Sequence, residues 1–406
     1  MMATFGCNLR PDFFLESQYI PLNHGSFGAY PRALRPLLHY FQEKAETHPD
    51  RWLRREMFPV LQENREAVAN MIHCDPEELA FIMNASYGMN TVLRSIPMKE
   101  GDKILCFSTA YNAVDRLLAY IQDSRKAKLV QLELIYPLSD QQILDMTREA
   151  IEREGPESFK LGVFDAISSV PGVRFPFEKM CKLLKEYNIL SLVDGAHAIG
   201  QIPLDLHAVD PDFFTTNCHK WLFAPRGTAL LYVPKRNQRL IHPAIINVSY
   251  KDHRDLEDQR SSYQDEFSWP GTIDFSSYMC VKQALKYRDS LGGEDKIQTY
   301  CNDLARKGGQ IAANILGTDV LENDEKNLTL HMVNVRLPLQ NTTLTDSQIT
   351  NHFYDKLMYE HNTMASPYKH NNKWYARLSA QVYLGEEDFE HAAKALLSVC
   401  SDLNKQ

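Results

Sequence analysis

The sequence lacks several features that would assign it to a common class of protein. No apolar run approaches the roughly 20 residues that a membrane-spanning helix needs. Its 44 Lys and Arg are outnumbered by 52 Asp and Glu, and the resulting net charge of −8 argues against a nucleic-acid partner, which normally meets a basic face. It contains neither a Walker A motif nor a G-x-G-x-x-G sequence, so a nucleotide site has little support. We therefore expect no membrane and no nucleic acid among its partners.

Disulfide, metal and secretion signals are also missing. The eight cysteines form no Cys-x-x-Cys pair and follow no regular spacing, which is typical of reduced thiols and predicts no metal site. The first ten residues, Met1 to Arg10, contain no apolar signal core. These patterns predict a cytoplasmic protein.

Short apolar runs that alternate with helical patterns are what the chain has instead. The runs lie at 80–83, 104–107, 130–134, 161–164, 189–193, 213–215 and 229–233. Residues 179–187 are one of the amphipathic helical stretches between them. The alternation predicts an α/β fold with a mostly parallel sheet covered on both faces. In such a sheet, ligands bind beyond the carboxyl ends of the strands.

The pattern changes after Pro270. A helix near 279–291 ends at Gly292-Gly293, and short strands are expected near 328–337 and 374–382. This predicts a large domain up to residue 270 and a smaller α+β domain over 271–406. Upstream, residues 32–72 are expected to be largely helical, broken at Pro36, Pro49 and Pro59, and to reach across the surface or to a partner subunit. The mixed-charge run at 251–260 is expected to be a solvated loop.

The most informative feature is the spacing between an acid and a lysine. His219 and Lys220 lie 25 and 26 residues after Asp194. Asp194 closes one apolar run and Lys220 follows another strand, so both side chains are expected at neighbouring strand ends. An acid and a lysine placed in this way can flank one small ring. Pyridoxal 5′-phosphate (PLP) requires this arrangement: an amine for the Schiff base and a carboxylate for the pyridine nitrogen.

Each of these residues also has an ordinary structural explanation. An isolated lysine is usually a solvated charge, and an acid at a strand end commonly caps a helix. The apolar residues after Lys220, beginning with Trp221, favour a desolvated amine with a lowered pKa. His197 is expected one helical turn beyond Asp194, although a buried core histidine would fit the pattern too.

Three further segments carry groups that suit an anion. Asn84 to Asn90 follows a strand and opens a helix, whose first N–H groups, with the Ser86 hydroxyl, suit a phosphate or form only a cap. Arg377 lies on a half-buried strand and needs an anion, either a substrate carboxylate or an internal acid. Thr272 follows a turn at Gly271 and is either another phosphate donor or a cap.

Taken together, these segments resemble the fold-type I PLP enzymes of the aminotransferase class V superfamily. The matching motifs, in family order, are Asn23-His-Gly-Ser-Phe-Gly28, Asn84-Ala-Ser-Tyr-Gly88, Asp194-Gly-Ala-His197, His219-Lys220, Gly271-Thr272 and Arg377. Each motif is weak alone, but the ordered set is specific. The branch that contains isopenicillin N epimerase-like proteins is the most similar. The segment Asp165-Ala-Ile-Ser-Ser-Val-Pro-Gly-Val-Arg-Phe-Pro176 resembles its fungal members, which include ergothioneine-pathway C–S lyases and a loline-type enzyme.

The resemblance implies a role for each matching residue. Lys220, Asp194 and His197 would be the catalytic residues: Lys220 would form the Schiff base and move the α-proton, and Asp194 would pair with the pyridinium. The expected cofactor contacts are His197 and Ser169 at the ring hydroxyl, Tyr111 on the ring face, and Ala85, Ser86, Asn217 and His219 at the phosphate. Thr272 would reach the phosphate of the other subunit in a homodimer.

The substrate side follows from the same resemblance. Arg377 would hold the carboxylate of an amino acid, with Asn23 and His24 close to the substrate. Residues 1–30 would then form an N-terminal segment near the active site, and 31–270 the large PLP-binding domain. The fold expected is that of aspartate aminotransferase-like PLP-dependent transferases.

The type of reaction is less well specified. β-Elimination from a cysteine conjugate or sulfoxide is favoured, while transamination, epimerisation and a PLP-dependent cyclisation of alkaloid biosynthesis share its first step. A PLP-binding protein without turnover is a remote alternative. Cysteine desulfurases need a mobile cysteine late in the chain, and after Cys280 only Cys301 and Cys400 remain, neither of them in a plausible active-site loop. Persulfide chemistry is therefore not expected.

Overall fold

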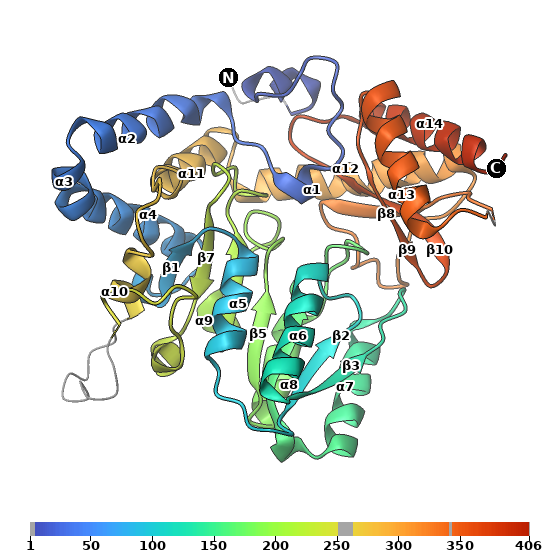
Figure 1. The fold of residues 1–406 in the computed structure, drawn as a ribbon. Helices are drawn as coiled ribbons and strands as arrows, with labels where there is room; N and C mark the ends of the chain where they lie inside the picture. Colours follow the sequence, from blue (N-terminus) through green and yellow to red (C-terminus); the bar gives the residue numbers. More distant parts are fainter. Residues whose placement is uncertain (1–4, 251–262, 341–342, 406) are drawn as a thin grey trace.

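The computed structural model describes residues 5–250, 263–340 and 343–405. A large sheet with helices on both faces occupies one part of the molecule, and a small antiparallel sheet with its own helices occupies the other (Figure 1). The mixed-charge run at 251–260 lies outside the described residues, so the expectation of a loop there stays a prediction.

The large sheet contains seven strands in the described part of the chain. They are β1 (Leu79–Ile82), β2 (Lys103–Phe107), β3 (Lys128–Leu132), β4 (Phe159–Asp165), β5 (Leu190–Asp194), β6 (Phe213–Asn217) and β7 (Ala229–Tyr232). Each overlaps one of the seven apolar runs. Six of these strands are mostly buried and read as continuous apolar segments, whereas the edge strand β3 is partly exposed. The order is β1-β7-β6-β5-β4-β2-β3, and only β7 runs antiparallel to its neighbours. The mostly parallel sheet is confirmed.

Helices cover both faces of this sheet (Figure 1). The covering helices are α5 (Ala85–Ser95) and α6 (Asn112–Arg125) on one face, and α7 (Asp140–Glu154) and α8 (Phe177–Glu186) on the other. The apolar stripe of α5 packs into one hydrophobic cluster with Ile104 and Leu192. On the opposite face, Met180 and Leu184 of α8 pack with Phe164. The sheet therefore lies between two apolar layers, as the alternation of strands and helices predicts.

The small domain contains an antiparallel sheet of three described strands in the order β8-β10-β9. Its elements, with the preceding helix, are α11 (Val281–Ser290), α12 (Glu294–Leu316), β8 (Met332–Arg336), α13 (Asp346–Asp355), β9 (Ser366–His370), β10 (Lys373–Ser379) and α14 (Glu386–Leu403). The strands expected near 328–337 and 374–382 correspond to β8 and β10. β9 was not predicted, because Pro367 interrupts its apolar pattern.

The remaining helices come mostly from the first part of the chain. They are α1 (His24–Phe27), α2 (Arg35–Thr47), α3 (Pro49–Arg51), α4 (Met57–Met71), α9 (Leu206–Val209) and α10 (Tyr263–Ser268). The chain does break before Pro49, but Pro36 lies in the first turn of α2, where a missing N–H costs no intrahelical bond. Pro59 does not break the helix either, because a π-helical turn, Trp52–Glu56, joins α3 to α4 and the helical chain continues through Pro59.

One hydrophobic core joins the two ends of the chain. Leu9 and Phe13 are buried together with Leu396 of α14, and the Gly6 amide donates a 2.8 Å hydrogen bond to the Val382 carbonyl. Trp52 also belongs to this core, so the helices after residue 31 pack on the small domain as well as on the large one. The domain bounds at 30 and 270 stay predictions.

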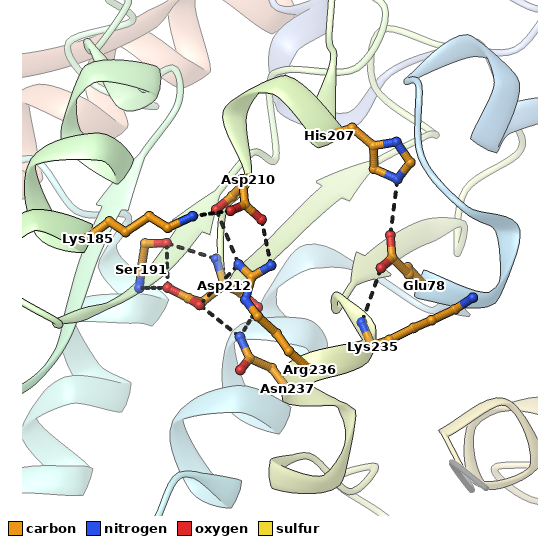
Figure 2. Close-up of polar contacts among 9 residues, drawn as sticks. All are labelled: Glu78, Lys185, Ser191, His207, Asp210, Asp212, Lys235, Arg236 and Asn237. Atoms are coloured by element: carbon orange, nitrogen blue, oxygen red, sulfur yellow. Dashed lines mark hydrogen bonds and ion pairs between the residues drawn. The ribbon is translucent and has the colours of Figure 1, made fainter.

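A polar network fixes the edge of the sheet at which β5 and β6 begin (Figure 2). Asp212, just before β6, accepts hydrogen bonds from the Ser191 amide at 3.0 Å and from Asn237 at 2.9 Å. Arg236 donates to Asp210 at 2.6 Å. These contacts tie β5 to the segment after β7 and leave the carboxyl-terminal edge free for a ligand. No helix among the described residues is both long and apolar enough to span a membrane.

Candidate active site

The expected catalytic residues meet at the carboxyl edge of the sheet. Asp194 is the last residue of β5, Asn217 is the last of β6, and Lys220 follows in the next turn. Because β5 and β6 are parallel neighbours, their ends lie side by side. The sequence spacing between Asp194 and Lys220 therefore places an acid and an amine at adjacent strand ends, as predicted.

Lys220 contacts His197 directly. The Nζ atom of Lys220 lies 3.0 Å from Nε2 of His197. Burial and the nearby Arg377 lower the pKa of Lys220 to about 7, although Asp194 and Asp165 oppose the shift. Burial also lowers the pKa of His197 well below its usual value, helped by the charge of Lys220. The amine is thus available in its unprotonated, nucleophilic form near neutral pH.

Asp194 is a buried carboxyl, with 5% of its surface exposed. Burial raises its pKa, while a 3.0 Å hydrogen bond from the Ala196 amide and the charge of Lys220 act in the opposite direction. Asp194 forms no ion pair with any residue that the structure describes. A cationic ring nitrogen would supply the partner that this carboxylate lacks.

Asp165 is a second buried acid beside Asp194. It ends β4 and pairs in register with Asp194 across the two strands, so both side chains project from the same face. Burial, and then the negative charge of Asp194, raise the pKa of Asp165 well above its usual value. Burial and the charge of Asp194 therefore both favour the protonated form of Asp165. Asp165 was not among the predicted site residues, although its position at a strand end was a usable signal.

The expected phosphate residues surround the first turn of α5. Asn84 caps this helix by accepting from the Tyr87 amide at 2.8 Å, and Asn217 accepts from the Ala85 amide at 2.9 Å. Nδ1 of His219 lies 2.9 Å from the Thr228 carbonyl, which can only accept, so Nδ1 carries the proton and Nε2 is left for a ligand. Burial lowers the pKa of His219 to about 4. A bound phosphate would favour its protonation.

Arg377 of β10 is a buried guanidinium without an acidic partner in the described chain. It donates to the Ser169 carbonyl, to Asn23 Oδ1 and to Ser26 Oγ, each at 2.8 Å. Its Nε has no hydrogen-bond partner. Desolvation lowers its pKa to about 10, so it remains charged. A buried cation that is held only by neutral groups is suited to a substrate carboxylate rather than to an internal ion pair.

His24 contacts the main chain of Lys220. Its Nε2 lies 2.8 Å from the Lys220 carbonyl and its Nδ1 lies 2.7 Å from the Tyr383 hydroxyl. The carbonyl can only accept, so Nε2 donates and Nδ1 accepts from Tyr383. Both ring nitrogens are thus occupied, and this geometry assigns His24 to positioning the Lys220 main chain. The substrate contact expected of His24 stays a prediction, as does that of Asn23, which lies beside Arg377.

Gly28 brings the N-terminal segment against the same turn. It has φ +64°, and a Cβ atom at this position would lie 1.7 Å from the His219 carbonyl oxygen. Only glycine permits this approach. Arg226 fastens the segment further by donating to the Gly28 carbonyl at 2.8 Å. The motif Asn23-His-Gly-Ser-Phe-Gly28 therefore packs against the turn that carries the lysine.

The structure does not bring every expected residue into contact. Tyr111, the N-cap of α6, is 46% exposed, and Thr272 lies on an exposed turn next to the segment between α3 and α4. Ser86 lies in the first turn of α5, beside Ala85. Their cofactor contacts stay predictions. No group of His, Cys, Asp or Glu suited to a metal occurs in residues 5–250, 263–340 and 343–405.

A family model for aminotransferase class V matches residues 31–350. The chain belongs to this family. It is 32% identical over 401 residues to hercynylcysteine sulfoxide lyase of Schizosaccharomyces pombe, covering 98% of each chain. It is 30% identical over 439 residues to the L-cysteine desulfhydrase-like protein lolT1 of Epichloe uncinata, covering 98% of this chain and 96% of the relative. Isopenicillin N epimerase of Streptomyces clavuligerus is 25% identical and covers 95% of this chain and 96% of its own.

Solved structures share the fold at lower identity. The cystine C–S lyase C-DES, in complex with cysteine persulfide, has a TM-score of 0.78 at 16% identity and covers 94% of this chain and 98% of its own. Apo cysteine desulfurase of Thermococcus onnurineus NA1 has a TM-score of 0.77 at 18% identity and covers 99% of this chain and all of its own. At these identities the likeness shows the fold alone. The expected fold type I class is confirmed.

This family depends on PLP, which confirms the expected cofactor. The residues at the strand ends fit it. A buried acid without an ion pair is available for the ring nitrogen, an unprotonated amine for the aldehyde, and a helix N-terminus for the phosphate. His197 lies next to the amine. The assignments of individual atoms to the cofactor remain proposals.

Proposed function

We propose that the protein is a cytoplasmic, homodimeric C–S lyase, which removes the α-proton of a cysteine conjugate or cysteine sulfoxide and eliminates its sulfur group. The observation that carries the choice of elimination is the likeness, over 98% of both chains, to a sulfoxide lyase. The L-cysteine desulfhydrase-like relative also supports cleavage of a carbon–sulfur bond. Epimerisation shares the site but is supported by a more distant relative, isopenicillin N epimerase, at 25% identity.

The protein's own residues have defined tasks in this reaction. PLP supplies an electron sink for the carbanion formed at the α-carbon. Arg377 binds the substrate carboxylate, and Asn23 and Ser26 hold the guanidinium in place by hydrogen bonds. Lys220 receives the α-proton at Nζ, which its lowered pKa allows near neutral pH. Asp194 would pair with the ring nitrogen of the cofactor.

A persulfide route through a protein thiol has no support in the site. Cys301 and Cys400 are both buried, and burial raises the pKa of each thiol to about 12. A buried thiol of this kind is a poor nucleophile. The proposal is therefore elimination without a cysteine intermediate, in contrast to what the desulfurase fold relatives would suggest.

The homodimer is proposed from two features of the surface. Thr272 lies on an exposed turn. The neighbouring Pro270 and Ile273 line an apolar groove with Met83 and Ile245, which are 41% and 53% exposed. A second copy would cover this apolar surface. Light scattering should give twice the 46.7 kDa mass of the chain, and a stable monomer at micromolar concentration would reject the dimer.

Product analysis tests the proposed reaction. The purified protein with PLP is supplied with S-alkyl cysteines, cysteine sulfoxides and ordinary amino acids, and Lys220→Ala is the control. Pyruvate and ammonia formed without a keto acid support elimination. A strict need for a keto acid would show transamination, and racemised substrate would show epimerisation. A cyclised product would show bond-forming chemistry, and PLP binding without any turnover would indicate a non-catalytic protein.

A further inference from the structure

The indole of Trp221 contacts the histidine beside the active-site lysine. Nε1 of Trp221 lies 3.2 Å from Nδ1 of His197, and Nε2 of the same imidazole lies 3.0 Å from Nζ of Lys220. Trp221 and His197 are 1% and 2% exposed. The three side chains thus form a buried hydrogen-bonded chain that ends at the reactive amine.

The direction of the hydrogen bonds in this chain follows from the indole. An indole nitrogen carries a hydrogen and cannot accept, so Nδ1 of His197 must be the acceptor. In a neutral imidazole the proton is then on Nε2, which faces Lys220. A hydrogen bond from Nε2–H to Nζ requires a lone pair on the amine. This arrangement favours the unprotonated form of Lys220.

The opposite tautomer would have the opposite effect. With the proton on Nδ1, the imidazole N–H would face the indole N–H, and Nε2 would offer its lone pair to Lys220. A protonated lysine would then be the favoured partner. His197 is neutral rather than doubly protonated, because burial and the charges of Lys220 and Arg377 all lower its pKa. The remaining choice is between the two neutral tautomers.

Trp221 is itself held firmly. Its carbonyl accepts a 2.6 Å hydrogen bond from Arg288 of α11, which is paired with Glu294 at the start of α12. Its ring packs against His331 at 5.3 Å between centroids and 74° between planes. His24 lies on another side at 5.2 Å. The indole N–H therefore has a fixed direction, aimed at Nδ1 of His197.

We propose that Trp221 is a positioning residue that holds His197 in the Nε2–H tautomer and so keeps Lys220 as a free amine. Capture of PLP joins Nζ to the aldehyde carbon and releases the aldehyde oxygen as water, and only the unprotonated amine has the electron pair for it. Trp221 thereby sets the pH range of cofactor capture. The proposal depends on the family's cofactor and not on the choice of elimination, so it can be tested even if no cysteine conjugate is cleaved.

The tautomer can be observed in the unaltered protein. The protein is stripped of PLP and labelled with ¹⁵N-histidine, and His197→Gln identifies the resonances of this residue. The expected result is a neutral imidazole with its hydrogen on Nε2. A hydrogen on Nδ1 would overturn the proposal, whatever the behaviour of any Trp221 variant.

Cofactor capture gives the second test. The rate at which added PLP develops its bound absorbance is measured against pH for the wild type, for Trp221→Phe and for Trp374→Phe, a buried tryptophan of β10 that serves as control. The wild-type midpoint is expected near pH 7, in line with the pKa of Lys220. Trp221→Phe should move this midpoint up by about one unit, which is a loss of about fivefold at pH 7.

The shape of the pH profile distinguishes a positioning role of Trp221 from a general loss of structure in the variant. At high pH, Trp221→Phe should recover the wild-type rate, because every Lys220 is then unprotonated. Trp374→Phe should keep the wild-type midpoint. A uniform loss at all pH values, or an unchanged midpoint in Trp221→Phe, would reject the role. If Trp221→Phe does not fold, the tautomer measured in the unaltered protein decides.

Discussion

Asp165 and Asp194 pair in register at the carboxyl ends of β4 and β5, two buried acids on the same face of the sheet. Two carboxylates this close cannot both be charged at low cost, and the environment separates them. Asp194 accepts a main-chain N–H from Ala196 and is stabilised by Lys220. Burial and the charge of Asp194 raise the pKa of Asp165, so Asp165 is the acid of the pair that more readily holds a proton.

This division of charge predicts different effects for the two asparagine variants. Asp165→Asn replaces the acid that more readily holds a proton by a neutral group of similar size, so PLP affinity and activity at pH 7 should stay within roughly twofold of the wild type. Asp194→Asn removes the charge that faces the ring nitrogen, and activity should fall by roughly 100-fold or more. Steady-state kinetics and PLP titration compare the pair. Equal losses in both variants would contradict the assignment.

Asp165 also predicts a dependence of stability on pH. Its folded-state pKa is raised above the ordinary value of 3.8, so between these two values the folded protein binds a proton that the unfolded chain has released. Its contribution to stability is complete below the ordinary pKa and is lost as pH rises through the folded pKa. Urea denaturation of the apoprotein at several pH values should show that the free energy of unfolding falls less with rising pH in Asp165→Asn than in the wild type.

Arg377 should be sensitive even to replacement by lysine. Lysine keeps the charge but loses the planar fork that holds a carboxylate by two hydrogen bonds. For Arg377→Lys we expect KM for the amino-acid substrate to rise by roughly 10- to 100-fold, or about 1.4 to 2.8 kcal/mol. Arg336→Lys is the matched control, because Arg336 lies on the neighbouring strand β8 and pairs with Asp319 on the exposed side. An unchanged KM for Arg377→Lys would show that Arg377 does not bind the substrate carboxylate.

Tyr383 should stabilise the protein through His24. In Tyr383→Phe the buried Nδ1 of His24 loses its only donor, which should cost about 1 to 3 kcal/mol of unfolding free energy. Tyr359→Phe, at a side chain that is 79% exposed, should change almost nothing. Chemical denaturation of both variants gives the comparison. The hydrogen bond would be unimportant if the two variants were equally stable.

Gly28 and Gly101 form a matched pair for a steric test. Both have positive φ, +64° and +87°, so alanine is strained at either position by roughly 1 to 2 kcal/mol. At Gly101 a Cβ meets nothing within 4 Å, whereas at Gly28 it collides with the His219 carbonyl. Gly28→Ala should therefore lose PLP and activity as well as stability, and Gly101→Ala should lose only stability. PLP content after gel filtration distinguishes them.

The sequence could predict what depends on local pattern and order. The seven strands of the large sheet and the α5 terminus at Asn84 were found because buried strands are apolar runs and caps have characteristic residues. Lys220 and Asp194 were found because strand ends adjacent in the sheet are close in space. For β9, the proline in the strand removed the apolar signal.

Other contacts could not be read from one sequence. The contact of His24 with the Lys220 carbonyl spans 196 residues and gives no local signal. The same holds for Ser26 on Arg377 and for the indole N–H of Trp221 on His197. A tryptophan after a lysine reads simply as an apolar residue. The tautomer that it selects depends on where a distant imidazole lies in the folded molecule.

The shared core of Leu9, Phe13 and Leu396 has a consequence for how the protein is made on the ribosome. The chain emerges from its first residue, so the N-terminal segment is exposed long before α14 exists to receive it. The large sheet, with both Asp194 and Lys220, is complete by Tyr232, whereas Arg377 is synthesised near the end. A nascent chain should therefore be able to take up PLP before it can hold an amino acid. Ribosome-bound chains that are stalled before residue 377 are expected to bind PLP and turn yellow, but not to bind or convert an amino acid.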